Sequence, residues 1–126
     1  MTDALITLNA GSSSIKFALY DAHSLAPQGR GLIEHLGGEA KLHSRPAGAA
    51  AIDRALSAKE GADHRAALDV AFATLRAATP GLEVAAVGHR IVHGGRVFSA
   101  PARIDDEVLA ALTALEPLAP LHQPHN

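Results

Sequence analysis

Two apolar segments joined by a short polar turn constrain this chain more than any other feature of its sequence. Residues 4–9, ALITLN, are almost all apolar, as in a strand that is covered on both faces. Residues 14–20, SIKFALY, alternate, with Ile15, Phe17 and Leu19 on one face. The glycine and serines between the segments are typical of a tight turn. The sequence therefore predicts a β-hairpin at the start of the chain.

Further along the chain the pattern changes from strands to alternating helices and strands. We predict strands at 29–35, 40–45 and 83–93, of which 40–45 has a weaker pattern than 29–35. Helices are predicted at 63–79 and 106–116. Residues 46–62 are rich in alanine and glycine and give no clear assignment. Strands followed by a helix, a strand and a helix predict an α/β fold with a mixed sheet.

Each predicted helix has a candidate capping residue and an apolar stripe. Asp63 is placed to cap the first helix, and Asp105 or Asp106 to cap the second. Ile104 is expected to pack on Leu109 at the start of the second helix. The first helix is expected to bury Leu68, Phe72, Leu75 and Thr79, with Ala71 and Ala78 beside them. The second is expected to bury Val108, Leu109, Leu112 and Leu115.

Composition excludes several classes of function. The net charge of −2 gives no bulk attraction to nucleic acid or to an anionic membrane, so neither is expected as a partner. The absence of cysteine excludes disulfides and zinc–thiolate sites. The first residues carry no basic leader and no apolar run of membrane-spanning length, so we expect a cytoplasmic protein. Hydrophobic residues make up 48% of the chain and aromatic residues only 3%, which predicts a largely aliphatic core.

The turn of the first hairpin, within NAGSSSIKF, is a candidate phosphate-binding loop. Backbone N–H groups of a glycine-containing turn can form a concavity that binds anions. Ser12, Ser13 and Ser14 could add hydroxyl donors. Lys16 could add a positive charge, and Asn9 a carboxamide for a phosphate or a metal-bound water. The turn does not match a Walker A loop, because no second glycine precedes the lysine and a strand follows it. A plain serine-rich turn with solvated hydroxyls remains the alternative.

A second candidate site lies in AVGHRIVHGG, residues 86–95. Strand alternation places Arg90 and Val92 on one face and His89 and His93 on the other. A guanidinium beside a small apolar side chain suits a short carboxylate, because the guanidinium forks the carboxylate and the valine meets the tail. A surface ion pair for the arginine and core packing for the valine are the alternatives. The two histidines are too far apart on a strand to share a metal readily.

A third candidate is PLAPLHQPHN, residues 117–126, in which His122 has a backbone restrained by neighbouring prolines and could donate to a phosphoryl oxygen. An exposed loop histidine is the alternative. A proline-rich segment of this kind rarely closes a domain, so we expect the sequence to be part of a longer chain.

The three motifs NAGSSSIKF, GHRIVHGG and PLAPLHQPHN occur in this order and at these separations in acetate kinases. The whole chain resembles the amino-terminal third of that family, and its first hairpin is also similar to the acetate and sugar kinase/Hsc70/actin superfamily. The resemblance implies a ribonuclease-H-like (actin-like ATPase) domain, truncated within residues 1–126, with the carboxyl-terminal domain absent. It also implies a homodimer for the full-length protein.

By the same resemblance, the function is the Mg²⁺-dependent, reversible transfer of a phosphoryl group from ATP to acetate, giving ADP and acetyl phosphate. The family's residues carry over motif by motif: Asn9 resembles the metal-site asparagine, and Arg90 the carboxylate-binding and catalytic arginine. Ser12, Ser14 and Lys16 resemble the phosphate-binding residues, Val92 and Leu121 the walls of the methyl pocket, and His122 the catalytic histidine.

Two alternatives to an acetate kinase stay open. Propionate and butyrate kinases share much of the pattern, although valine rather than alanine at position 92 favours acetate. A non-catalytic module that keeps only the phosphate-binding hairpin is the other alternative. The family's remaining catalytic residues have no counterpart in these 126 residues, so the chain by itself is expected to be inactive.

Overall fold

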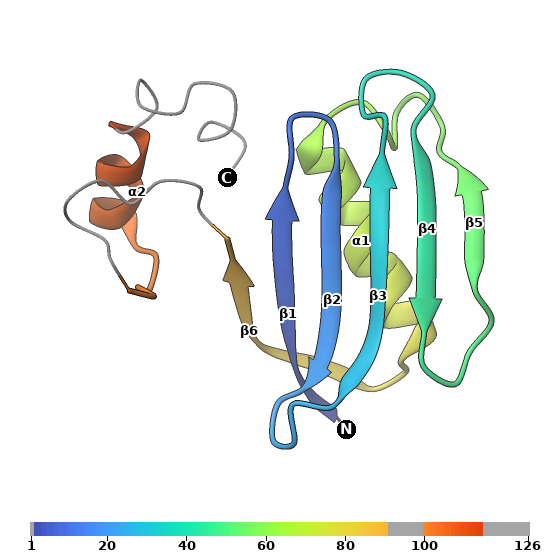
Figure 1. Cartoon of the computed structure of the whole chain (residues 1–126), viewed down its shortest axis with the longest axis horizontal. Coiled ribbons are helices and arrows are strands. Elements are labelled where there is room, and N and C mark those ends of the chain that lie inside the picture. The colour runs from blue at the N-terminus through green and yellow to red at the C-terminus, as the bar shows by residue number, and fades with distance from the viewer. Residues whose placement is uncertain (1, 91–99, 115–126) are drawn as a thin grey trace.

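A computed structural model of the chain describes residues 2–90 and 100–114, and the following account concerns those residues (Figure 1). The strands are β1 (Thr2–Ala10), β2 (Ile15–Asp21), β3 (Pro27–Glu34), β4 (Lys41–Pro46), β5 (Ile52–Ala55) and β6 (Leu82–His89), and the helices are α1 (His64–Ala78) and α2 (Asp106–Thr113). The predicted hairpin is β1 and β2. The other predicted strands and helices are present, with residues 91–93 and 115–116 outside the described part.

The strands form one sheet in the order β5-β4-β3-β2-β1-β6. Strands β1 to β5 pair antiparallel with their neighbours, whereas β6 returns after α1 to lie parallel to β1. The predicted mixed sheet is therefore confirmed. Strand β5 lies in the stretch 46–62, for which the sequence pattern allowed no clear assignment. It was not predicted because it has only four residues, three of them exposed. So short a strand has little apolar pattern of its own.

Helix α1 lies across one face of the sheet, behind β2 and β3 in Figure 1. Asp63 caps it as predicted, with a carboxylate that accepts from the N–H of Ala66 at 2.8 Å. The face that it buries matches the predicted one only in part, at Ala71 and Leu75. Its buried residues are Ala67, Val70, Ala71, Thr74 and Leu75, while Leu68 and Phe72 are only partly buried. Small residues at the centre let the helix approach the sheet closely, so the large side chains are displaced to either side.

The core lies between α1 and the sheet. It contains Ile6, Ile15, Phe17, Leu19, Ile33 and Leu42 from the strands, together with Val70 and Leu75 from the helix. Strand β1 was predicted to be covered on both faces, and this is wrong for the described residues. Ala4, Ile6 and Leu8 are buried against the helix, whereas Asp3 and Thr7 on the opposite face are exposed.

A glycine in β3 makes room for the largest side chain of the core. Gly31 pairs with Phe17 of β2, and the phenyl ring lies under the glycine. A Cβ atom at position 31 would stand 2.2 Å from the ring, which no side chain can tolerate without movement. The absence of a side chain at residue 31 therefore allows the ring to be 98% buried, with 2% exposed.

Helix α2 packs much more loosely. Asp105 caps it, one of the two predicted candidates, with its carboxylate accepting from the N–H of Val108 at 2.8 Å. Of the stripe expected to be buried, Leu112 is buried, but Leu109 remains 55% exposed and Leu115 lies outside the described residues. No helix in the described part of the chain is long and apolar enough to cross a membrane.

Candidate functional site

The hairpin turn between β1 and β2 is held in a defined shape by backbone contacts. The N–H of Gly11 donates to the carbonyl of Ser14 at 2.9 Å, and the N–H of Leu36 donates to the carbonyl of Ser13 at 2.9 Å. A Cβ at position 11 would lie 2.6 Å from the hydroxyl oxygen of Ser14, so the glycine permits this close approach. Ser12 is exposed and Ser14 is half-buried. Both hydroxyls lie in a turn whose geometry is fixed.

The start of α1 contacts the same turn. The Nε2 atom of His64, the first residue of the helix, lies 2.6 Å from the carbonyl oxygen of Gly11, so the ring nitrogen donates to the turn. This contact joins residues 53 positions apart in the chain. The sequence analysis did not single out His64, because nothing local indicates what a histidine at a helix start will contact.

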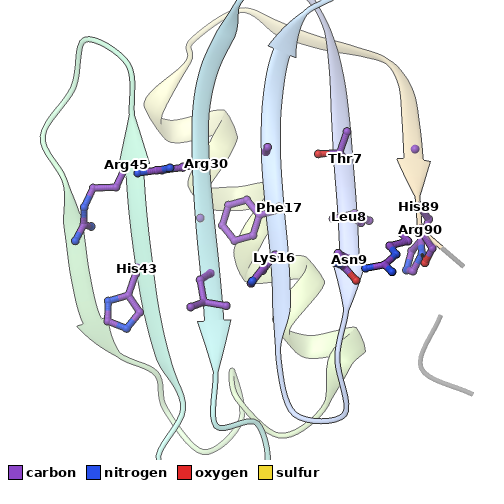
Figure 2. Close-up of a pocket in the computed structure, with 14 residues that line it drawn as sticks. Thr7, Leu8, Asn9, Lys16, Phe17, Arg30, His43, Arg45, His89 and Arg90 are labelled. Atoms are coloured by element: carbon purple, nitrogen blue, oxygen red, sulfur yellow. Dashed lines mark hydrogen bonds between the residues drawn. The ribbon is translucent and has the colours of Figure 1, made fainter. Parts of the chain in front are cut away.

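Three of the predicted site residues, Asn9, Lys16 and Arg90, lie in or directly after adjacent strands on the face away from α1. Asn9 of β1 is the cross-strand partner of Lys16 of β2. Arg90 directly follows His89, the cross-strand partner of Leu8. The N–H of Arg90 donates to the Leu8 carbonyl at 3.0 Å. Figure 2 shows the side chains of Asn9 and Arg90 side by side, with Lys16 on the next strand. The predicted phosphate and carboxylate residues are thus brought together.

These residues border a pocket of about 820 Å³ on the open face of the sheet (Figure 2). Four lining side chains carry a permanent or near-permanent positive charge, and they are Lys16, Arg30, Arg45 and Arg90. None of the described lining residues is acidic, although the whole chain has a net charge of −2. A cavity with this lining attracts anions. His89, the cross-strand partner of Leu8, also borders the pocket at the end of β6.

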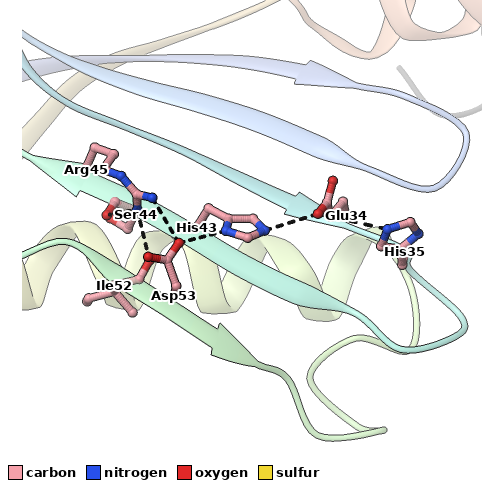
Figure 3. Close-up of polar contacts among 7 residues, drawn as sticks. All are labelled: Glu34, His35, His43, Ser44, Arg45, Ile52 and Asp53. Atoms are coloured by element: carbon pink, nitrogen blue, oxygen red, sulfur yellow. Dashed lines mark hydrogen bonds and ion pairs between the residues drawn. The ribbon is translucent and has the colours of Figure 1, made fainter.

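The far wall of the pocket holds a polar network that sequence reasoning missed (Figure 3). Nδ1 of His43 lies 2.8 Å from Oδ1 of Asp53, and Nε2 lies 3.1 Å from Oε1 of Glu34. Arg45 donates to the same Asp53 oxygen at 3.0 Å. His43 and Arg45 lie on β4, between Glu34 on β3 and Asp53 on β5. Neither partner could be inferred before the order of these strands was known.

This network shifts the acidity of its members. The hydrogen bond to Asp53, and then the one to Glu34, raise the pKa of His43 above its usual value. The hydrogen bonds from His43 and Arg45 lower the pKa of Asp53. Both shifts favour the charged forms, as expected when opposite charges share hydrogen bonds.

Three predicted site residues, Val92, Leu121 and His122, lie outside the described residues. Asn9, Ser12, Ser14, Lys16 and Arg90 are described and lie at or near one end of the open face. Within the described part of the chain, no group of three or more histidine, aspartate or glutamate side chains is arranged to hold a metal ion.

Two solved structures with the same architecture are an acetate kinase and a propionate kinase. The crystal structure of Porphyromonas gingivalis acetate kinase superposes with a TM-score of 0.87 at 32% identity, covering 98% of this chain and 32% of that one. The structure of a propionate kinase from Francisella tularensis superposes with a TM-score of 0.82 at 29% identity, covering 98% and 31%.

The sequence itself matches the acetokinase family over residues 4–126. It is 44% identical over 133 aligned positions to an acetate kinase of Rhodopseudomonas palustris and 45% identical over 124 positions to one of Pseudomonas aeruginosa. The chain therefore belongs to the acetokinase family, and it corresponds to the amino-terminal portion of its relatives. It spans about a third of their length, 32% and 30% for these two.

Proposed function

We propose that the protein containing this chain is an acetate kinase, which transfers the γ-phosphoryl group of ATP to acetate and gives acetyl phosphate and ADP. The observation that carries the proposal is the continuous match to the acetokinase family over residues 4–126. That match includes the segment in which Asn9, Lys16 and Arg90 border one cationic pocket. Acetate, ATP, ADP and acetyl phosphate are the proposed small-molecule partners.

Arg90 is the proposed carboxylate-binding residue. Its guanidinium presents paired N–H donors that match the two oxygens of a carboxylate. It is exposed at the mouth of the pocket, next to Asn9, so a small acid can reach it. Held in this way, one acetate oxygen can be aligned with the γ-phosphorus of ATP. That oxygen forms the new bond as the bond from phosphorus to the ADP oxygen breaks.

Lys16, Ser12 and Ser14 are the proposed phosphate-binding residues. The lysine is exposed on the pocket side of β2, and the serines belong to the adjoining turn. Phosphoryl transfer requires mainly alignment and positive charge around the transferred group. Strong base catalysis is not needed, because acetate is already ionised at neutral pH.

Mg²⁺ is the proposed metal, and the described residues supply only part of what it needs. Asn9 offers one neutral oxygen, whereas magnesium usually takes one or two carboxylates together with substrate phosphates and waters. The carboxamide therefore fits a contact to the hydration shell of a metal carried by ATP. When bound, the metal neutralises phosphate charge.

The remaining parts of the site are proposed from the resemblance to the family. Val92 and Leu121 are the proposed walls of the methyl pocket, and His122 the proposed donor to the transferring phosphoryl group. Residues 1–126 would form part of a first ribonuclease-H-like domain, with a second domain completing the nucleotide site. A homodimer in the cytoplasm is proposed for the full-length protein.

Trapping of acyl phosphate by hydroxylamine tests this proposal. The protein at its natural length should form acetyl phosphate from ATP, Mg²⁺ and acetate, and residues 1–126 alone should form none above background. Failure of the natural-length protein to form any acyl phosphate, despite binding ATP, would favour a non-catalytic phosphate-binding protein.

Propionate kinase is the second candidate, because a propionate kinase has the same fold over nearly all of this chain. We expect Val92→Ala to enlarge the acyl pocket and to lower the preference for acetate over propionate. A difference of one methylene is worth about 1–3 kcal/mol in such a pocket. The ratio of kcat/KM for the two acids measures the effect. An unchanged ratio would show that Val92 does not line the pocket.

A further inference from the structure

Strand β5 is the least supported strand of the sheet. It has four residues, lies at the edge, and contributes Ile52 as its one partly buried side chain. Edge strands of this kind open more readily than central ones. Besides its backbone pairing with β4, β5 therefore depends on polar side-chain contacts more than on apolar burial.

The polar contacts of His43 join β5 to the strand beyond its neighbour. The cross-strand register aligns Leu32 of β3, His43 of β4 and Asp53 of β5 in one row on the open face. From the centre of that row the imidazole reaches Asp53 with one nitrogen and Glu34 of β3 with the other (Figure 3). A single side chain thus spans three strands.

The two contacts require a particular protonation state. A neutral imidazole has one N–H and can donate to one carboxylate only, whereas the protonated ring donates from both nitrogens. Nδ1 is 2.8 Å from the Asp53 carboxylate and Nε2 is 3.1 Å from the Glu34 carboxylate. If the ring were neutral, one of its two nitrogens would carry a lone pair in place of a hydrogen, and that lone pair would face a carboxylate oxygen.

We propose that protonated His43 clamps the edge strand β5 to the sheet by bridging Asp53 and Glu34, and that loss of its proton loosens the strand. The raised pKa of His43 agrees with this assignment, since both carboxylates stabilise the charged ring. The direction of the pH dependence follows from this raised pKa. Stabilisation is complete below the ordinary histidine pKa and is lost as pH rises through the higher pKa of the folded state.

Other charged groups face this clamp and define what it can do. Arg45 also donates to Asp53, at 3.0 Å, and holds part of β5 at every pH in the physiological range. Lys41 is the cross-strand partner of Glu34, and His35 lies 3.9 Å from the same carboxylate. Deprotonation of His43 should therefore weaken the attachment of β5 without abolishing it.

The clamp also affects the pocket. His43 and Arg45 line its far wall, opposite Arg90 (Figure 2). A looser β5 would let that wall move, and a neutral His43 would remove one positive charge from the lining.

Hydrogen exchange measured by mass spectrometry on the natural-length protein tests the clamp. Protection factors, corrected for the intrinsic effect of pH, are compared between about pH 5.5 and about pH 8, where histidine changes its charge. We expect protection of residues 52–55 to fall by about two- to fivefold at the higher pH, the range for exposed ion pairs. Protection of β1 should stay constant.

Substitutions of His43 and Asp53 show whether the pH dependence of protection comes from the contact between them. His43→Gln should lower protection of β5 at the lower pH and remove its dependence on pH. Asp53→Asn should do the same from the other side of the contact, even if the first variant folds poorly. His23→Gln is the matched control, because His23 is an exposed histidine 3.6 Å from the Asp3 carboxylate and lies in the turn after β2, outside β4 and β5. It should behave as the wild type.

Three results would overturn the proposal. One is protection of β5 that does not change with pH in the wild type. Another is a pH dependence that survives in His43→Gln. The third is an equal fall in β1, which would mean that the histidine acts on the whole fold.

Discussion

The two faces of the sheet are made by the same strands and have opposite roles. The face toward α1 is buried and largely apolar, with Ile6, Ile15 and Leu19 at most 2% exposed. The opposite face carries Asn9 and Lys16, together with the cations that line the pocket. Adjacent residues in one strand therefore have different surroundings, one packed in the core and the next facing the pocket.

The difference between the faces has a simple physical origin. Side chains alternate across a strand, so a period of two sends every second residue to each face. A helix of small residues can cover one face closely, and this leaves the other free for polar groups. Mutations on the two faces should then separate stability from activity.

The largest expected effect is on the covered face. Ile6→Ala should lower the free energy of unfolding by about 2–5 kcal/mol, because it leaves a cavity where the side chain is 0% exposed. Thr7→Ala, one residue along and exposed on the other face, should change it by about 0.5 kcal/mol or less. Urea unfolding of both variants measures the contrast. Equal effects would mean that the two faces are not energetically distinct.

On the open face, activity should change without stability. Arg90→Lys should be nearly as damaging as Arg90→Ala, with kcat/KM for acetate lower by about a hundred- to a thousandfold. An ammonium keeps the charge but cannot fork a carboxylate. Thermal unfolding should match that of the wild type, since the side chain is exposed. Full activity in the lysine variant would show that charge alone is sufficient.

Two glycines offer a smaller and closely matched test. Gly31→Ala should lower the free energy of unfolding by about 1–3 kcal/mol, because the new methyl group meets the ring of Phe17. Gly88→Ala, in β6, places a methyl group where nothing lies within 4 Å. It should leave stability unchanged or raise it slightly. A destabilised Gly88→Ala would show that β6 tolerates less than its open surroundings indicate.

The smallest expected effect concerns a surface ion pair beside β5. Arg54 donates from two nitrogens to Glu60 and lowers the pKa of that carboxyl to about 2. The depressed pKa means that the contribution is complete above the ordinary value of 4.5 and is lost as pH falls toward 2. Glu60→Gln should flatten this part of the pH dependence of the urea midpoint. An unchanged profile would show that the pair adds no net stability.

The sequence predicted the elements with strong local patterns. Alternation and turn chemistry predicted the hairpin. Residue type and position predicted the cap Asp63 and narrowed the second cap to Asp105 or Asp106, of which Asp105 is the cap. The short β5 was missed because three of its four residues are exposed. The buried stripe of α1 was predicted correctly at Ala71 and Leu75, whereas Leu68 and Phe72 are only partly buried beside the small residues that meet the sheet.

What the sequence alone determined is the alternation of β1 and β2, the glycine turn between them and the residue types of the candidate site. These depend on neighbours along the chain, so short-range physical chemistry is sufficient to infer them. Only the tertiary structure decided that Arg90 lies beside Asn9, that His64 contacts the turn, and that His43 bridges Glu34 and Asp53. Those contacts depend on strand order and on the return of β6 to β1, and no local pattern specifies which distant strands become neighbours.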